Sequence, residues 1–183
     1  MKRVLASLAA LFMVCFMASC CKTTTVTVEN FKQEAPKFVD KDVTITGVAN
    51  HICSHSGRKL FLVSENGGDD MVTVFTNPDM KPFDRETIGK TYTVKGIVKI
   101  TQTIDNEYLD KWEEEVLAQI AEGEAQEEES HCGTENKAAG IDVDETAENP
   151  QIAQIKAFRK KIAENDGEPL VFYHIECESF EIK

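Results

Sequence analysis

Alternating apolar and polar positions in the first half of the chain predict a β-sheet. Four segments show this period of two and are rich in β-branched and aromatic residues, as strands are: 42–53, 59–64, 71–75 and 90–100. Stretches rich in Gly, Asn, Asp, Ser and Pro separate these segments and are typical of turns. A fifth segment of the same kind, 169–183, follows much later in the sequence.

Helical spacing replaces this alternation after the fourth predicted strand. Within 104–121, apolar residues recur every three or four positions opposite a face of glutamates: Tyr108, Leu109, Trp112, Val116, Leu117 and Ile120. The stripe predicts an amphipathic helix that packs on the barrel, with Trp112 as part of that contact.

A second helix is predicted just before the fifth strand. Asn149 is suited to the N-cap and Pro150 to the first helical position, and Asp166-Gly167 ends the pattern. Apolar residues follow one face of this helix: Ile152, Ile155, Phe158 and Ile162. Shorter helices are predicted at about 30–39, before the first strand, and at 84–89, before the fourth.

The segment between the two longer helices, 122–149, is acidic and has few large apolar residues. Such a composition offers little surface to bury, so the segment is predicted to be non-helical and dispensable for folding. It nevertheless contains a histidine beside a cysteine, His131 and Cys132.

The predicted order of strands and helices is that of an OB-fold. Three strands, a short helix, a fourth strand, an insertion and a fifth strand form a five-stranded Greek-key barrel. The sequence therefore predicts a mainly β fold, with two helices and an acidic loop inserted between the fourth and fifth strands.

From about residue 25 onward the chain also resembles a known family. Three stretches are similar to the OB-fold domains, described as tRNA-anticodon-like, of Bacteroidota lipoproteins: "VDKDVTITGVANHICSHSGRKLFLV", "IGKTYTVKGIVKI" and "FYHIECESFEI". The strand order and the glycine-centred "TITGV" and "TVKGIV" are the similar features, and the resemblance implies the OB-fold.

The N-terminal residues have the pattern of a lipoprotein signal peptide. Lys2 and Arg3 precede an apolar run, Val4 to Ala18, that is shorter than the roughly 20 residues of a membrane-spanning helix. Small residues then lead to Cys20, as in a bacterial lipobox. The predicted organisation is a signal peptide at 1–19, a lipid-anchored tether at 20–28 and an OB-fold domain at 29–183 with its insertion at 105–168. Thr-rich residues after Cys20, without an acidic cluster, favour an anchor facing the periplasm.

Removal of the predicted acylation site tests whether the protein is anchored to the membrane. A Cys20→Ala variant is expected to move from the membrane to the soluble fraction, because stable anchoring requires the acyl chains that Cys20 would bear. Fractionation followed by immunoblotting measures the distribution. Retention of the variant in membranes would refute the lipoprotein prediction.

Charge and motifs narrow the function classes. The chain has 20 basic and 32 acidic residues, a formal net charge of −12, which predicts that it does not bind nucleic acid. The membrane, through Cys20, and another envelope protein are the expected partners. The sequence has no phosphate-binding loop, no nucleophile elbow and no pair of histidines on a helix, so we do not expect an enzyme.

The segment "HICSHSG" suggests a metal site. His51, Cys53 and His55 alternate at the predicted end of the first strand, and the OB-fold brings this loop near the insertion that contains His131 and Cys132. A set of Cys53, His55, His131 and Cys132 would suit zinc or copper. In a straight strand His51 and His55 lie roughly 13 Å apart, so one of them is not a ligand.

Other interpretations of the cysteines remain open. Cys53 and Cys132 could form a disulfide in the periplasm, or both thiols could be free and without a role. Cys177 is predicted to face the core, and His174, on the opposite face of the strand, to lie on the surface. Two functions follow: a lipid-anchored protein that binds a metal ion or a metal-containing ligand, and a module that binds another envelope protein.

Overall fold

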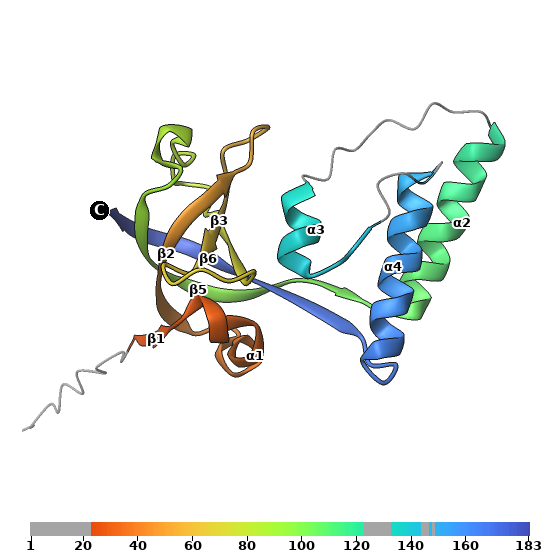
Figure 1. Ribbon diagram of the computed structural model, residues 1–183, viewed down its shortest axis with the longest axis horizontal. Helices are drawn as coiled ribbons and strands as arrows, with labels where there is room; N and C mark the ends of the chain where they lie inside the picture. Colours follow the sequence, from red (N-terminus) through yellow and green to blue (C-terminus); the bar gives the residue numbers. More distant parts are fainter. Residues whose placement is uncertain (1–22, 123–132, 144–146, 148) are drawn as a thin grey trace, which may run out of the picture.

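The computed structural model describes residues 23–122, 133–143, 147 and 149–183 (Figure 1). Its strands are β1 (Thr24–Val26), β2 (Asp42–Ile52), β3 (Lys59–Val63), β4 (Met71–Thr76), β5 (Thr91–Ile104) and β6 (Leu170–Ile182). Its helices are α1 (Val28–Phe38), the short 3-10 helix η1 (Arg85–Thr87), α2 (Asn106–Glu122), α3 (Gly133–Ala139) and α4 (Pro150–Glu164). All five predicted strands and all four predicted helices are confirmed.

Strands β2 to β6 close into a barrel. They follow the order β2-β3-β4-β6-β5, and β5 pairs back with β2. The pairing of β4 with β6 is parallel, and the other pairings within the barrel are antiparallel. This order confirms the predicted OB-fold. In OB-fold terms, β3 and β4 are the second and third strands, and the helical insertion joins the fourth strand to the fifth.

A further strand, β1, was not predicted. It pairs in parallel with β2, with Thr24 opposite Val43, so part of the predicted tether belongs to the sheet. Val26 and Val28 are 3% and 2% exposed and belong to the same core cluster as Val43.

The glycines of "TITGV" and "TVKGIV" lie where neighbouring strands approach each other closely. A Cβ atom at Gly47 would lie 2.8 Å from the backbone oxygen of Val63, and one at Gly96 would overlap the backbone oxygen of Glu176. Only glycine leaves room for these approaches. The two motifs are therefore part of the barrel geometry.

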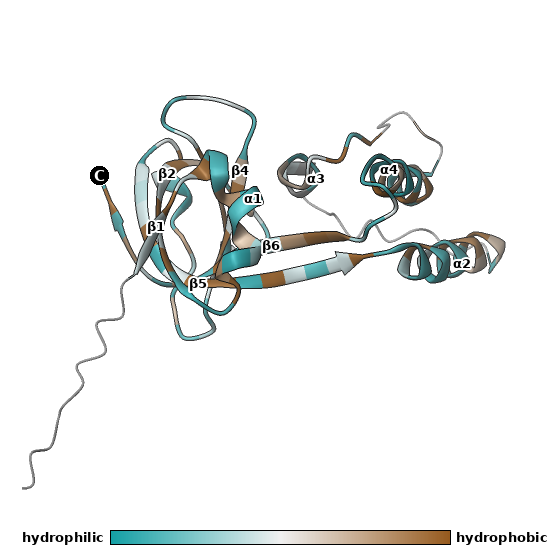
Figure 2. Cartoon of the chain, turned by 90° about the horizontal axis from the view of Figure 1, so that it is seen from below, coloured by the Kyte–Doolittle hydropathy of each residue, from teal (hydrophilic) through white to brown (hydrophobic). Residues whose placement is uncertain are grey.

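Beyond the barrel, β5 and β6 continue as a two-stranded ribbon that leads to the helices (Figures 1 and 2). Ile104 pairs with Leu170 at the far end of this ribbon. The helices of the insertion have a core of their own, separate from the barrel core. Its buried members are Ile104, Leu109, Val116, Ile141, Ile155, Phe158 and Ile162.

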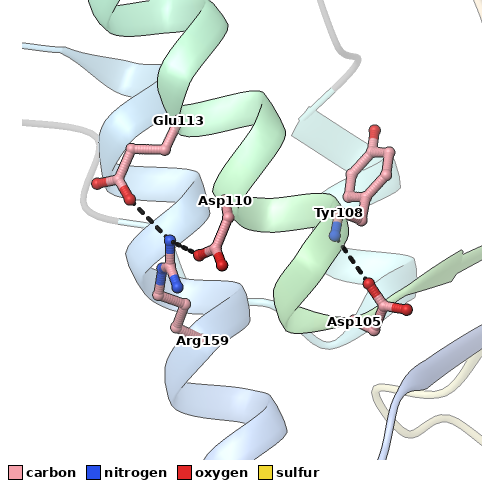
Figure 3. Close-up of polar contacts among 5 residues, drawn as sticks. All are labelled: Asp105, Tyr108, Asp110, Glu113 and Arg159. Atoms are coloured by element: carbon pink, nitrogen blue, oxygen red, sulfur yellow. Dashed lines mark hydrogen bonds and ion pairs between the residues drawn. The ribbon is translucent and has the colours of Figure 1, made fainter.

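Helix α2 packs against α4 within this second core, whereas the sequence predicted packing on the barrel. Arg159 of α4 makes ion pairs with Asp110 and Glu113 of α2, at 2.9 Å and 2.7 Å, as Figure 3 shows. Asp105 caps the start of α2 by accepting a hydrogen bond of 2.8 Å from the backbone N–H of Tyr108. None of the described helices is long and apolar enough to cross a membrane.

Part of the predicted non-helical segment is structured. Residues 133–139 form α3, and Ile141, which follows it, is 6% exposed within the helical core. The prediction underestimated this segment because it rested on the acidic, apolar-poor composition of the whole stretch, and composition does not show that one isoleucine, Ile141, is buried. Residues 133–143 are therefore not expected to be dispensable for folding.

Candidate binding cavity

Of the predicted metal ligands near the end of β2, His51 lies on an irregular stretch of the strand, whereas Cys53 and His55 follow it. A bulge between Ala49 and His51 shifts the pairing with β3, and the ring of His51 packs 5.7 Å from that of Phe61. Cys53 is 7% exposed, and its carbonyl accepts a hydrogen bond of 2.9 Å from the N–H of Gly57, which closes the turn. His55 is exposed in this turn.

The other two predicted ligands, His131 and Cys132, lie outside the described residues, as does Cys20. Within the described ranges no three His, Cys, Asp or Glu side chains are grouped as a metal site, and Cys53 and Cys177 form no disulfide with another described cysteine. Neither the Cys53–His55–His131–Cys132 site nor the Cys53–Cys132 disulfide is tested by this, and both stay predictions.

On β6, Cys177 faces the barrel core as predicted, but the exposure predicted for His174 differs from the structure. Cys177 is fully buried in the barrel core, as expected, and burial raises the pKa of its thiol to about 11. His174 points to the outside but is 9% exposed, so its prediction as a surface residue was wrong. The ring of Phe75, from the neighbouring strand β4, stacks on it at 4.3 Å, and Thr101 lies 2.8 Å from its Nδ1.

The buried imidazole of His174 is expected to make stability depend on pH. Burial is the largest cause that lowers its pKa; Lys99 lowers it further, whereas Glu176 raises it. As the pH falls below the ordinary histidine value of about 6.5, the unfolded chain takes up a proton before the folded chain, so stability is lost. Urea unfolding at about pH 7.5 and pH 5.5 measures this loss. A His174→Phe variant keeps a ring against Phe75 and should lose less stability; an equal loss would contradict the assignment.

A cavity of about 510 Å³ lies between the outer face of β3 and β4 and the helical insertion. The barrel contributes Lys59, Thr73 and Phe75, and the ribbon formed by β5 and β6 contributes Thr101 and Phe172 among others. Helices α2, α3 and α4 provide the remaining wall. The volume falls within the range of roughly 300–1,000 Å³ that is usual for ligand pockets.

Two helical stripes face this cavity. Tyr108, Trp112 and Glu115 recur at intervals of four and three along α2. Gln151, Gln154 and Phe158 recur at intervals of three and four along α4. Residues at this spacing share one face of a helix, so each helix presents a mixed aromatic and polar stripe to the same space. Figure 3 shows the Tyr108 ring on the other side of α2 from Arg159.

Six of the described aromatic residues line the cavity, and four of them form a connected cluster. Trp112 lies 6.2 Å from Tyr108 and 6.4 Å from Phe158, and Phe158 meets Phe172 edge to face at 6.1 Å. On the barrel side, the ammonium of Lys59 lies 5.4 Å above the ring of Phe75. The rings therefore form an apolar surface on the helical side of the cavity, whereas on the barrel side the Phe75 ring is flanked by Lys59 and by the stacked ring of His174.

Four amide side chains of the described residues contribute hydrogen-bonding groups to the lining: Gln102, Asn136, Gln151 and Gln154. The amide of Gln154 donates a hydrogen bond of 2.8 Å to Oδ1 of Asn136, which ties α4 to α3. Among the described lining residues, Lys59 and Glu115 are the charged ones, and their charges balance. The cavity thus suits a ligand with flat rings and polar edges.

The sequence contained a signal for this cavity that periodicity alone could not interpret. Trp112 was assigned to the packing face of its helix, and Gln151 and Gln154 were not distinguished from solvent-exposed residues. Helices α2 and α4 each turn one face toward the other helix and a second face toward the cavity. Such a helix has polar residues at helical spacing beside an aromatic residue. "QIAQIKAF" has this pattern.

Solved structures to which the chain is similar are OB-fold proteins. The telomere capping protein Ten1 from Saccharomyces pombe has 13% identity and a TM-score of 0.28, with 41% of this chain and 66% of that chain covered. A putative aspartyl-tRNA synthetase from Leishmania major Friedlin has 18% identity and a TM-score of 0.32, with 51% and 19% covered. The aspartyl tRNA synthetase from Entamoeba histolytica has 11% identity and a TM-score of 0.33, with 79% and 38% covered.

The match covers less than two thirds of each of these three proteins. No protein-family model matches the chain, and no curated protein matches it by sequence. The likeness concerns the fold, which the strand order already establishes.

The comparison corrects the exclusion of nucleic acid. That prediction rested on the acidic composition, yet the similar OB-fold proteins are, by their names, a telomere capping protein and tRNA synthetases. The prediction was wrong to exclude nucleic acid on this ground, because net charge averages over the whole chain, whereas charges farther away than about 8 Å are largely screened at physiological salt. The lining of a site decides its ligand, and here Glu115 is matched by Lys59.

Proposed function

We propose that the chain is an OB-fold binding module that holds bases of single-stranded nucleic acid in the cavity between its barrel and its helical insertion. The observation that supports this most directly is the position of the aromatic cavity. It lies on the outer face of β3 and β4, beside the insertion between the last two strands, and OB-folds bind oligonucleotides and oligosaccharides on this face.

Stacking is the interaction that the cavity offers. Tyr108 and Trp112 on α2 present their rings to the cavity, and every base has a flat π-face that can pack against such rings. Stacking of a base on an aromatic side chain contributes about 1–3 kcal/mol, as measured by substitution with alanine. Two or three stacked bases would give useful affinity without a strongly basic surface.

The charges of the cavity set a second expectation. Lys59 is the one basic residue among the described residues that line it, so few phosphates can be neutralised there. Affinity should therefore fall only shallowly with salt, since the slope follows the number of phosphates contacted. If Cys20 anchors the chain in the periplasm, the nucleic acid would be that present outside the cytoplasm.

Binding of a labelled thymidine oligonucleotide of about ten residues tests the proposal. We expect saturable binding by fluorescence anisotropy, weakened about 5- to 150-fold in a Tyr108→Ala variant because one stacking surface is lost. Trp112 is the only tryptophan of the chain, so its fluorescence should also be quenched as the oligonucleotide binds.

An Ile88→Ala variant serves as the control, since Ile88 is 43% exposed and does not line the cavity. It should bind as the unmodified protein does. Absence of binding at low salt, or equal weakening by both substitutions, would contradict the proposal.

A neutral oligosaccharide is a second candidate, supported by the balanced charges of Lys59 and Glu115. Sugar rings also pack on aromatic side chains, and their hydroxyl groups suit the amides of the lining. Quenching of Trp112 by maltohexaose or chitohexaose, with no response to the oligonucleotide, would favour this ligand instead.

A further inference from the structure

We propose that Gln151 recognises the hydrogen-bonding edge of the bound base and is the specificity-determining residue of the cavity. This inference rests on the function proposed above, because it concerns how the same cavity distinguishes one base from another. It follows from the place of Gln151 on α4 and from the hydrogen bonds of its neighbours.

Gln151 lies on the stripe of α4 that faces the cavity. It precedes Gln154 by three positions and Phe158 by seven, so the three side chains share one face of the helix. Phe158 packs 6.4 Å from Trp112, which places the aromatic cluster at one end of this stripe and Gln151 at the other. A ring stacked on the cluster would direct its edge along the stripe.

The amide side chains of the cavity differ in whether they are already hydrogen-bonded to another residue. Gln154 is engaged with Asn136 through the 2.8 Å hydrogen bond between α4 and α3. Gln151 lines the cavity and is partly buried, and no hydrogen bond joins its side chain to another described residue. Gln102 also lines the cavity but is exposed, so it is less constrained in direction than the partly buried Gln151.

An amide presents a donor and an acceptor side by side, which is the pattern needed to pair with the edge of a base. Glutamine and asparagine form such two-point contacts with adenine, and each well-made pair discriminates against the wrong base by roughly 5- to 150-fold. Stacking alone tolerates every base, because all have a π-face. A preference among bases would therefore come from an amide such as that of Gln151.

Equilibrium binding of three labelled ten-residue oligonucleotides, of adenosine, cytidine and thymidine, tests the inference. The unmodified protein should distinguish the best from the worst by about fivefold or more. In a Gln151→Met variant, which keeps the length of the side chain, this ratio should fall below about twofold through loss of affinity for the best oligonucleotide. A Gln33→Met variant is the matched control and should keep the original ratio, because Gln33 is exposed on α1 and does not line the cavity.

A Gln151→Glu variant gives a second, independent measurement. Its carboxylate only accepts hydrogen bonds, and carboxylates accept from the amino group of cytosine, so preference should shift toward the cytidine oligonucleotide. Equal binding of the three oligonucleotides by the unmodified protein, or an unchanged preference in both Gln151 variants, would overturn the inference and leave the proposed function standing. Failure of the unmodified protein to bind any of them would overturn the proposed function and the inference with it.

Discussion

A Gly96→Ala variant is expected to lose about 3 kcal/mol of stability, the upper end of what an added methyl group costs in a tightly packed site. The new Cβ atom would overlap the backbone oxygen of Glu176 and approach the side chain of Ile175 to 2.8 Å. A backbone oxygen cannot rotate away as a flexible side chain can. The clash must therefore move β6 away from β5.

The position of Gly96 makes this displacement costly for the whole barrel. Gly96 pairs with Cys177 beside a bulge, and β6 joins β5 on one side and β4 on the other. Movement of β6 thus weakens both pairings that close the barrel. Gly96 has no positive φ angle, so the expected loss comes from the contact and not from backbone strain.

Urea unfolding followed by circular dichroism measures the loss, and Lys95→Ala is the control. Lys95 is exposed on the same strand, so its replacement should change stability by less than about 0.5 kcal/mol. If Gly96→Ala were as stable as this control, the close approach of β5 and β6 at this point would be refuted.

The barrel could be predicted from the sequence because its strands are specified locally. Alternation in "TITGV" and "TVKGIV" sets which residues face the core, and Val43, Ile45, Val94 and Val98 are all fully buried as the pattern requires. Helix α4 was equally clear, since Asn149 caps it by accepting a hydrogen bond of 2.9 Å from the N–H of Ile152. Such signals act within a few residues of one another.

What the sequence did not predict depends on neighbours distant in the chain. His174 has the spacing of a surface residue and is buried because Phe75, from another strand, covers it. The cavity requires the arrangement of α2, α3 and α4 over β4, which no local pattern specifies. The bulge before His51 similarly alters the alternation on which the predicted spacing of the metal ligands relied.

The helical insertion is expected to lose stability separately from the barrel when Ile155 is replaced by alanine. Ile155 is fully buried in the core shared by α2 and α4, and removal of such a side chain costs about 2–5 kcal/mol. The buried members of this core are distinct from those of the barrel core. The loss should therefore fall mainly on α2 and α4.

Hydrogen exchange followed by mass spectrometry separates the two units. Peptides from α2 and α4 should exchange faster in the Ile155→Ala variant, whereas peptides from β2 and β3 should keep their protection. Lys156→Ala is the control, because Lys156 is exposed on the same helix and makes no contribution to either core. Its exchange should match that of the unmodified protein throughout.

The Ile155→Ala variant also tests whether oligonucleotide binding depends on the helical core. The α2 and α4 stripes that face the cavity are held in place by the helical core that includes Ile155 and by the ion pairs of Arg159 with Asp110 and Glu113. Loosening that core should weaken oligonucleotide binding while the barrel face, with Phe75, stays intact. Equal loss of protection in β2 and α4 would instead show that barrel and insertion unfold as one unit, and unchanged binding would show that the helical wall is not needed for the ligand.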